Sequence, residues 1–308
     1  MRVVRVPEGA GGWRVGAVLD DGLRLYPRGT SVLAALGAVV PEGAEPSPPG
    51  EYLAPLAGAV SLRDCVGFLD HVRNARRARG VREPLPPAWA ARPAFYFANP
   101  RSLLAATAPV ALPPGTAAFD LELEVGAVIG RPGRDLTPEQ AAGRIAGYVL
   151  YCDWSARDVQ SEERTMQIGQ GKGKDCAVSL GPWILTADEA AGLRRRDGLD
   201  IEVSVHINDE PLVRTRFLGM DWSFEELVAY ASVGADVLPG DVVASGTVPG
   251  GCLMEHSAEP DFRGWLRAGD RVRLDAGPLG LIETTIAPPP PVVSWREAAT
   301  TRATTITD

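Results

Sequence analysis

One segment of this chain combines two properties that a strand seldom shows together: strict alternation and a row of acids on one face. In FDLELEVGAVIG (residues 119–130), apolar residues recur at every second position, which predicts a β-strand with one face in a core. The opposite face carries Asp120, Glu122 and Glu124. Acids are depleted in strands and like charges repel, so this face is either solvated at a sheet edge or held together by a cation. Mg²⁺ and Ca²⁺ take such oxygen ligands.

The rest of the chain is mostly strand, with few helices and glycine-rich turns. Capping boxes predict three helices, over 61–79 (Ser61-x-x-Asp64), 137–145 and 223–232. No G-x-G-x-x-G motif follows a strand, which argues against a Rossmann domain. This pattern predicts an α+β fold that is rich in strands. Strands are expected at 119–129, 146–153, 182–186, 200–207, 211–216, 241–246, 270–275 and 281–286.

Composition divides the chain into three parts. Residues 1–58 contain a strand and a tight hairpin around Asp20-Asp21-Gly22, followed by the Pro/Gly-rich stretch 41–50. We therefore expect a small N-terminal β domain and a linker. Residues 59–287 form the expected main domain. Residues 288–308 begin with four prolines and are expected to be a loosely held C-terminal tail.

Charge and composition argue against several classes of partner. The 308 residues carry a formal net charge of −8, which disfavours nucleic acid and anionic membranes as partners. No apolar run reaches the roughly 20 residues that span a bilayer, and the first segment lacks the apolar region of a signal peptide. The four cysteines form no CxxC pair or zinc spacing, so we expect reduced, buried thiols in a cytoplasmic protein.

A further acid follows an apolar run. The segment IAGYVLYCDW (145–154) has the pattern of a buried strand whose carboxyl end carries Asp153. A buried carboxylate needs a partner, because an isolated buried charge is costly. Two interpretations remain open: Asp153 pairs with an arginine such as Arg157, or it shares a cation with Glu122 and Glu124.

The predicted helix over 61–79 supplies a third element. Asp64 and His71 are seven residues apart, so on a helix they point the same way within about 20°, about 10 Å apart along the axis. This geometry lets Asp64 reach a metal while His71 faces a substrate bound to it. The alternative is that His71 is a structural residue at the edge of an apolar stripe.

The lysine content singles out one more segment. Of the 31 lysine and arginine residues, only Lys172 and Lys174 are lysines, and both lie in the hexapeptide GKGKDC. Arginine replaces lysine easily on a solvated surface but not where a compact point charge must fit. The pattern therefore indicates a site residue in this hexapeptide, unless the clustering is chance.

Taken in order, these motifs resemble the fumarylacetoacetate hydrolase family over residues 60–285. The motifs that carry the resemblance are D64-x6-H71, FDLELEVGAVIG, DWSARDVQ (153–160), GKGKD (171–175) with SLGPW (179–183), and SGTVPGGCLME (245–255). The resemblance implies a β-rich catalytic domain of mixed sandwich or roll type behind a small β N-terminal domain. It also implies a homodimer and one Mg²⁺ or Ca²⁺ ion per subunit, held by carboxylates.

The resemblance also implies roles for individual residues. The family's catalytic histidine corresponds to His71, its orienting glutamate to Glu255 and its active-site lysine to Lys172. Three positions correspond to substrate contacts: Tyr96, Gln160 and Thr247. Four positions correspond to metal ligands: Asp64, Glu122, Glu124 and Asp153.

Two departures from the family pattern lie near the expected pocket. Gly80 stands where the family has an arginine, with Arg79 adjacent, and Val66 stands where it has a tyrosine. The implied function is metal-dependent hydrolysis of a C–C bond in a 1,3-dicarbonyl or 2-oxo acid. The alternatives are decarboxylation, isomerisation or dehydration by the same metal-enolate chemistry, and a non-catalytic, metal-containing binding protein.

Overall fold

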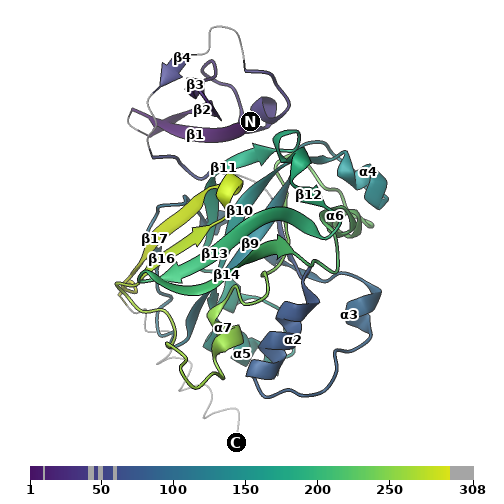
Figure 1. Cartoon of the computed structure of the whole chain (residues 1–308), viewed down its shortest axis with the longest axis vertical. Helices are drawn as coiled ribbons and strands as arrows, with labels where there is room; N and C mark the ends of the chain where they lie inside the picture. Colours follow the sequence, from purple (N-terminus) through teal and green to yellow (C-terminus); the bar gives the residue numbers. More distant parts are fainter. Residues whose placement is uncertain (10, 41–44, 48–50, 58–60, 292–308) are drawn as a thin grey trace, which may run out of the picture.

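Figure 1 shows the computed structural model of the chain, in which residues 1–9, 11–40, 45–47, 51–57 and 61–291 are described. Most of the expected linker and tail, residues 41–44, 48–50 and 292–308, lies outside the described residues. The strand-rich α+β class predicted from the sequence is confirmed. The strands form two sheets, and the helices that connect the strands along the chain are short.

The larger sheet has eleven strands and runs the length of the molecule. β7 (Leu103–Leu104) lies outside the main strand order of this sheet and pairs with β11 (Val178–Thr186). The main order is β4 (Glu45–Ser47), β3 (Gly22–Leu25), β2 (Gly12–Leu19), β1 (Arg2–Glu8), β11, β10 (Ile145–Ala156), β9 (Phe119–Ile129), β15 (Val242–Ala244), β5 (Leu62–Cys65) and β6 (Phe95–Ala98).

The second sheet has six strands, and β14 (Glu210–Leu218) pairs with β13 beside its main path. Its order is β12 (Arg194–Arg195), β13 (Gly198–Ile207), β16 (Arg271–Asp275), β17 (Leu281–Ala287) and β8 (Val110–Ala111). For the strands that the sequence predicts, most predicted ends lie within four residues of the ends in the structure. It misses β5 and β6, which carry residues of the candidate site.

The helices and 3₁₀ turns connect the strands. The α-helices are α1 (Val32–Leu36), α2 (Leu69–Ala78), α3 (Ala88–Ala91), α4 (Pro138–Ala142), α5 (Arg157–Thr165), α6 (Phe224–Ala231) and α7 (Leu253–His256). The 3₁₀ turns are η1 (Pro100–Ser102), η2 (Lys172–Lys174), η3 (Glu189–Gly192) and η4 (Gly277–Leu279). Capping boxes at Thr137 and Ser223 open α4 and α6 as predicted. Within the described part of the chain, each helix is too short or too polar to cross a bilayer.

The alternating strand β9 shows how the core positions the acids. Its apolar face enters the hydrophobic cluster between the two sheets, together with residues of β13, β16 and β17. β9 pairs with β10 on one side and β15 on the other, and all eleven of its residues are buried. The acids are therefore not on a solvated edge. Burial of both faces excludes the first of the two interpretations of this strand.

The helix predicted over 61–79 is wrong in its first part. Residues 62–65 form β5, which pairs parallel to β15 and antiparallel to β6. The helix begins only at Leu69, and its cap comes from far along the chain: Asp221 Oδ2 accepts a hydrogen bond from Leu69 N at 2.8 Å. Ser61 instead donates its backbone N–H to Asp241. Pairing partners distant in sequence thus override the local capping signal.

The N-terminal strands extend the large sheet. The hairpin predicted around Asp20-Asp21-Gly22 is confirmed, since β2 and β3 pair antiparallel across it. β1 pairs with β11, which connects residues 2–8 to the rest of the sheet (Figure 1). That residues 1–58 form a domain of their own stays a prediction.

Candidate active site

Four buried carboxylates gather on one face of the large sheet. The helices α2, α5 and α7 lie near one another at one end of the molecule (Figure 1). The strand register brings the carboxylates together. Glu122 on β9 lies opposite Asp153 on β10, and Glu124 lies one pleat further along β9. Asp64 comes from β5, which reaches β9 through β15. These are the four residues that the sequence predicts as metal ligands, and they lie in one cluster.

Hydrogen bonds from neutral groups support part of this cluster. The Tyr96 hydroxyl on β6 lies 3.0 Å from Asp64 Oδ2 and 2.5 Å from Asp153 Oδ2. Glu124 accepts a hydrogen bond from Gly246 N at 3.1 Å, and the Thr247 hydroxyl lies 3.4 Å from it. Tyr96 and Thr247, predicted as substrate contacts, therefore touch the carboxylates and line the same cavity.

Neighbouring positive charges stabilise some of these carboxylates more than others. Burial, together with Asp153, raises the pKa of Asp64 well above its usual value, and burial together with Asp64 does the same for Glu124. Burial also raises the pKa of Asp153, to about 6, although Lys174 opposes this. For Glu122, Arg157 and Lys174 outweigh burial, and its pKa is lowered. The Asp64–Glu124 side of the cluster thus lacks positive charge.

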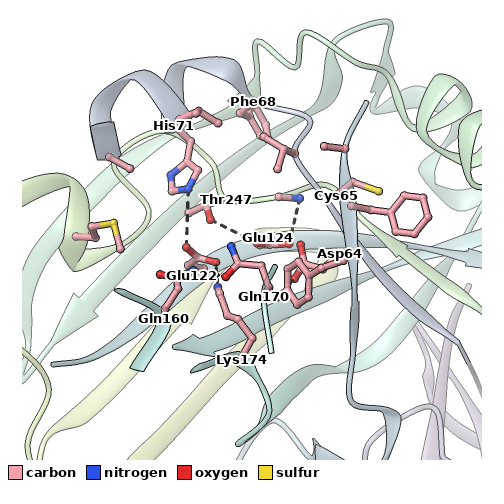
Figure 2. A pocket seen from close by; sticks show the side chains of 18 of the residues that line it. Asp64, Cys65, Phe68, His71, Glu122, Glu124, Gln160, Gln170, Lys174 and Thr247 are labelled. Atoms are coloured by element: carbon pink, nitrogen blue, oxygen red, sulfur yellow. Dashed lines mark hydrogen bonds and ion pairs between the residues drawn. The ribbon is translucent and has the colours of Figure 1, made fainter. Parts of the chain in front are cut away.

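His71 faces the cluster from α2 and is oriented from behind by Glu255 on α7. His71 Nδ1 lies 2.8 Å from Glu255 Oε1. On the other side of the ring, Nε2 lies 3.8 Å from Glu122 Oε1 (Figure 2). A carboxylate only accepts hydrogen bonds, so Nδ1 carries the hydrogen and Nε2 is left as the basic nitrogen. The second oxygen of Glu255 accepts from Asn74 Nδ2 at 2.7 Å and from Gly250 N at 3.0 Å.

The lysine of the cavity is Lys174, and the prediction of Lys172 is corrected. The Lys172 side chain is 76% exposed and its ammonium pairs with Asp175 at 2.5 Å. The Lys174 side chain is 3% exposed, and its ammonium lies 2.5 Å from Glu122 Oε2 (Figure 2). The ammonium also contacts Asp153. The segment forms a 3₁₀ turn. In such a turn, side chains two residues apart are rotated by about 240° about the turn axis, so they point in different directions. Only one of the two lysines can therefore face the cavity.

Arg157 and Gln160 on α5 form the polar wall of the cavity. Arg157 donates to Asp120 Oδ2 at 2.8 Å and to Glu122 Oε1 at 2.6 Å, so it is not the partner of Asp153. Gln160 accepts from Arg157 at 3.2 Å and lines the cavity, and its contact with substrate stays a prediction. The cavity has a volume of about 370 Å³, and its opposite wall is apolar. That wall includes Val66, Phe68, Val72, Ala75, Trp89 and Phe95.

Sequence reasoning missed two residues that hold the site together. Asp120 is fully buried and accepts hydrogen bonds from Leu253 N at 2.7 Å and Met254 N at 3.0 Å, at the start of α7. It thereby fixes the helix that carries Glu255. Asn74 holds Glu255 from α2; its spacing of one helical turn from His71 was the only available signal.

The cysteines are free thiols, as expected. Cys65, Cys152 and Cys252 are buried, and burial raises the pKa of each thiol well above its usual value. Among the described residues, His71, Cys252 and Glu255 form a group whose ligand atoms all lie within 4.8 Å of one another. His71 and Glu255 already hydrogen bond to each other, and the Cys252 thiol is neutral. This group therefore suits proton transfer better than metal binding.

The carboxylate cluster fits a hard divalent cation. Its donors are all oxygens, the ligand type that Mg²⁺, Ca²⁺ and Mn²⁺ prefer. Asp153 Oδ1 is buried and has no hydrogen-bond partner, which leaves it free to coordinate. Burial and the neighbouring carboxylates raise the pKa values of Asp64 and Glu124, so their ionised forms lack compensation that a bound cation would supply. Asp64, Glu122, Glu124 and Asp153 are the residues that would hold such an ion.

Comparison with known proteins agrees with this site. The chain is 32% identical over 171 residues to 2,4-didehydro-3-deoxy-L-rhamnonate hydrolase of Sphingomonas sp., an alignment that covers 56% of each protein. It spans about half the length of the curated relatives it matches.

Two solved structures share the fold. One is 5-carboxymethyl-2-hydroxymuconate delta-isomerase of Mycobacterium smegmatis (24% identity, TM-score 0.69, covering 94% of this chain and 100% of that one). The other is fumarylpyruvate hydrolase of Pseudomonas aeruginosa in complex with Mn²⁺ and pyruvate (24% identity, TM-score 0.60, covering 78% of this chain and 92% of that one). The family model for the fumarylacetoacetate (FAA) hydrolase C-terminal region matches residues 62–287. This chain therefore belongs to the fumarylacetoacetate hydrolase family of enzymes.

Proposed function

We propose that this enzyme hydrolyses a C–C bond in a 1,3-dicarbonyl or 2-oxo acid and that it requires a divalent cation, Mg²⁺ or Ca²⁺. The observation that carries the proposal is the His71–Glu255 pair, whose Nε2 faces the cluster of four buried carboxylates in a cavity of about 370 Å³. Two proteins named above support it, since one is named as a hydrolase of a didehydro sugar acid and the other holds Mn²⁺ with pyruvate.

A bound divalent cation would polarise the carbonyl oxygens of the substrate and stabilise negative charge on the departing fragment. The chain's own residues supply the proton transfers. His71 Nε2 takes a proton from water, whose oxygen attacks the distal carbonyl carbon, and Glu255 stabilises the imidazolium that forms. When the C–C bond breaks, the electron pair stays on the oxo-acid fragment, and the imidazolium returns the proton to that carbon.

Other residues of the cavity orient the substrate. Lys174 brings a compact positive charge next to the developing anion, and Gln160 offers its amide from the polar wall. Tyr96 and Thr247 hold the carboxylates from two sides. The apolar wall next to α2 excludes water from the substrate chain, so the water that reacts is the one that His71 holds.

Product analysis tests this proposal. The enzyme is incubated with a series of acylpyruvates and Mg²⁺ in water enriched in ¹⁸O, and the products are identified by mass spectrometry. Hydrolysis yields pyruvate and a carboxylic acid that carries one ¹⁸O atom from water. Carbon dioxide as product would instead indicate decarboxylation, an isomer of unchanged mass would indicate isomerisation, and loss of water would indicate dehydration. No product from any substrate would indicate a binding protein.

A further inference from the structure

The ammonium group of Lys174 lies inside the carboxylate cluster. The side chain is 3% exposed, and its ammonium contacts Glu122 Oε2 at 2.5 Å as well as Asp153 Oδ2. It also lies 5.8 Å from the centre of the Tyr96 ring. Two of the four carboxylates proposed to hold a divalent cation are thus already bound to a cation of the chain.

Backbone hydrogen bonds and close packing fix the turn that carries Lys174. The Glu163 carboxylate on α5 accepts hydrogen bonds from the backbone N–H groups of Gly171 (3.3 Å), Lys172 and Gly173 (3.2 Å). A side chain at Gly173 would lie 2.8 Å from Gln160 N, so the turn η2 packs directly on α5. With the turn fixed in this way, Lys172 points to solvent and Lys174 points into the cavity.

Each oxygen of Glu122 already accepts a hydrogen bond from a cationic side chain. Oε1 accepts from Arg157 at 2.6 Å and Oε2 accepts from Lys174. Asp153 Oδ2 is likewise in contact with Lys174 and Tyr96, whereas its Oδ1 is free. Among the described residues, the three ligand atoms that all lie within 4.8 Å of one another belong to His71, Cys252 and Glu255, so the carboxylate oxygens are spaced more widely around the ammonium.

We propose that Lys174 is the resident counter-cation of the metal-free site, and that a divalent cation which binds Glu122 and Asp153 displaces the Lys174 ammonium from them. This inference rests on the proposed metal site. It adds that the affinity for the metal is set by competition with an internal ammonium, and that metal loading moves the Lys174 side chain while the turn 172–174 keeps its hydrogen bonds to Glu163.

The first test measures the metal-free protein. Lys174→Met keeps the length of the side chain but leaves Glu122 and Asp153 facing each other without a cation. In excess chelator its melting temperature is expected to fall by roughly 5–10 °C relative to the wild type, whereas the matched control Lys172→Met changes it by less than about 1 °C. The double variant Glu122→Gln/Lys174→Met removes one negative charge together with the positive one and should recover part of the loss.

Titration of the same variants with Mn²⁺ alone tests the competition. Since the ammonium no longer has to leave, Lys174→Met should bind Mn²⁺ about tenfold more tightly than the wild type, and Lys172→Met should bind it equally well. Weaker or equal binding by Lys174→Met would overturn the proposal, because it would show that the ammonium does not compete with the ion.

Amine labelling shows whether the ammonium leaves. The chain has only two lysines, so a lysine-directed reagent followed by peptide mass spectrometry compares Lys174 with the exposed Lys172 as an internal standard. Lys174 should be protected in chelator and several-fold more reactive with saturating Mn²⁺. Protection that persists at saturating Mn²⁺ would refute displacement.

These tests separate this inference from the proposed function. If Mn²⁺ neither binds nor raises the melting temperature of any variant, the metal site and the competition are both wrong. If Mn²⁺ binds and exposes Lys174 but no acylpyruvate is cleaved, the proposed reaction is wrong and the role of Lys174 stands.

Discussion

Glu255→Gln is expected to inactivate the enzyme by changing which nitrogen of His71 carries the hydrogen. Asn74 Nδ2 and Gly250 N both donate to Oε2 of Glu255. In the variant the amide oxygen must take this position, because an amide NH₂ there would face two donors. The NH₂ group then points at His71 Nδ1, which lies 2.8 Å from Oε1 in the native protein, and forces it to accept. Nε2 now carries the hydrogen and cannot take a proton from water.

The size of the effect follows from this geometry. A positioned general base contributes about 10²–10⁴-fold to the rate, and a side chain in the wrong tautomer loses this contribution while the fold stays intact. We expect kcat to fall by about 10³–10⁴-fold, which corresponds to roughly 4–5.5 kcal/mol of transition-state stabilisation. The binding of metal and substrate should change little, because Glu255 contacts neither the carboxylate cluster nor the rest of the cavity wall.

Steady-state kinetics with the acylpyruvate identified in the product screen measures kcat and KM for both proteins. The matched control is Glu259→Gln, which changes a second histidine–glutamate pair at the surface: Glu259 Oε1 lies 3.0 Å from His256 Nδ1. This control should keep its activity. A Glu255→Gln variant that turns over at the wild-type rate would refute the assignment of His71 as the base and would favour a reaction that needs no water.

Three further outcomes are expected. Lys174→Arg should lose most turnover, because a broad, planar guanidinium would intrude on the bound substrate where a compact ammonium does not, whereas Lys172→Arg at the surface should be tolerated; kcat for both variants decides this. Asp120→Asn should destabilise the fold by about 2–4 kcal/mol in chemical denaturation, since it places an amide against donors at the start of α7. A cation at about a hundred times its Kd stabilises the fold by about 2.7 kcal/mol, so chelation should lower the melting temperature, and by less in Glu124→Gln; an unchanged melting temperature after verified metal removal would contradict the site.

The local pattern of the sequence was enough to predict the strands that carry most of the site. Alternation in β9 places Glu122 and Glu124 on one face, and the apolar run of β10 ends at Asp153, so both strands and their acids can be found without the fold. β5 could not be found in this way. Its strand form depends on pairing with β15, about 180 residues later in the chain, while Ser61 and Asp64 imitate a capping box.

The choice between the two lysines shows a second limit. Composition correctly singles out the hexapeptide, because a compact ammonium is retained there in a chain that otherwise uses arginine. Which lysine enters the cavity depends on the turn η2, and that turn is fixed by Glu163 from the preceding helix. An extended loop would point both side chains the same way, whereas a 3₁₀ turn separates them. The sequence holds no local signal for that difference.

The row of three acids on β9 shows why residue type and spacing alone do not assign a role. Asp120, Glu122 and Glu124 alternate identically along the strand. The side chain of Asp120 is fully used by donors of α5 and α7, so it belongs to the scaffold that joins Glu255 to the arginine beside Glu122. Glu122 contacts two cationic side chains, and among the described residues Glu124 contacts none. These different contacts come from long-range folding, and they separate the structural acid from the two that line the cavity.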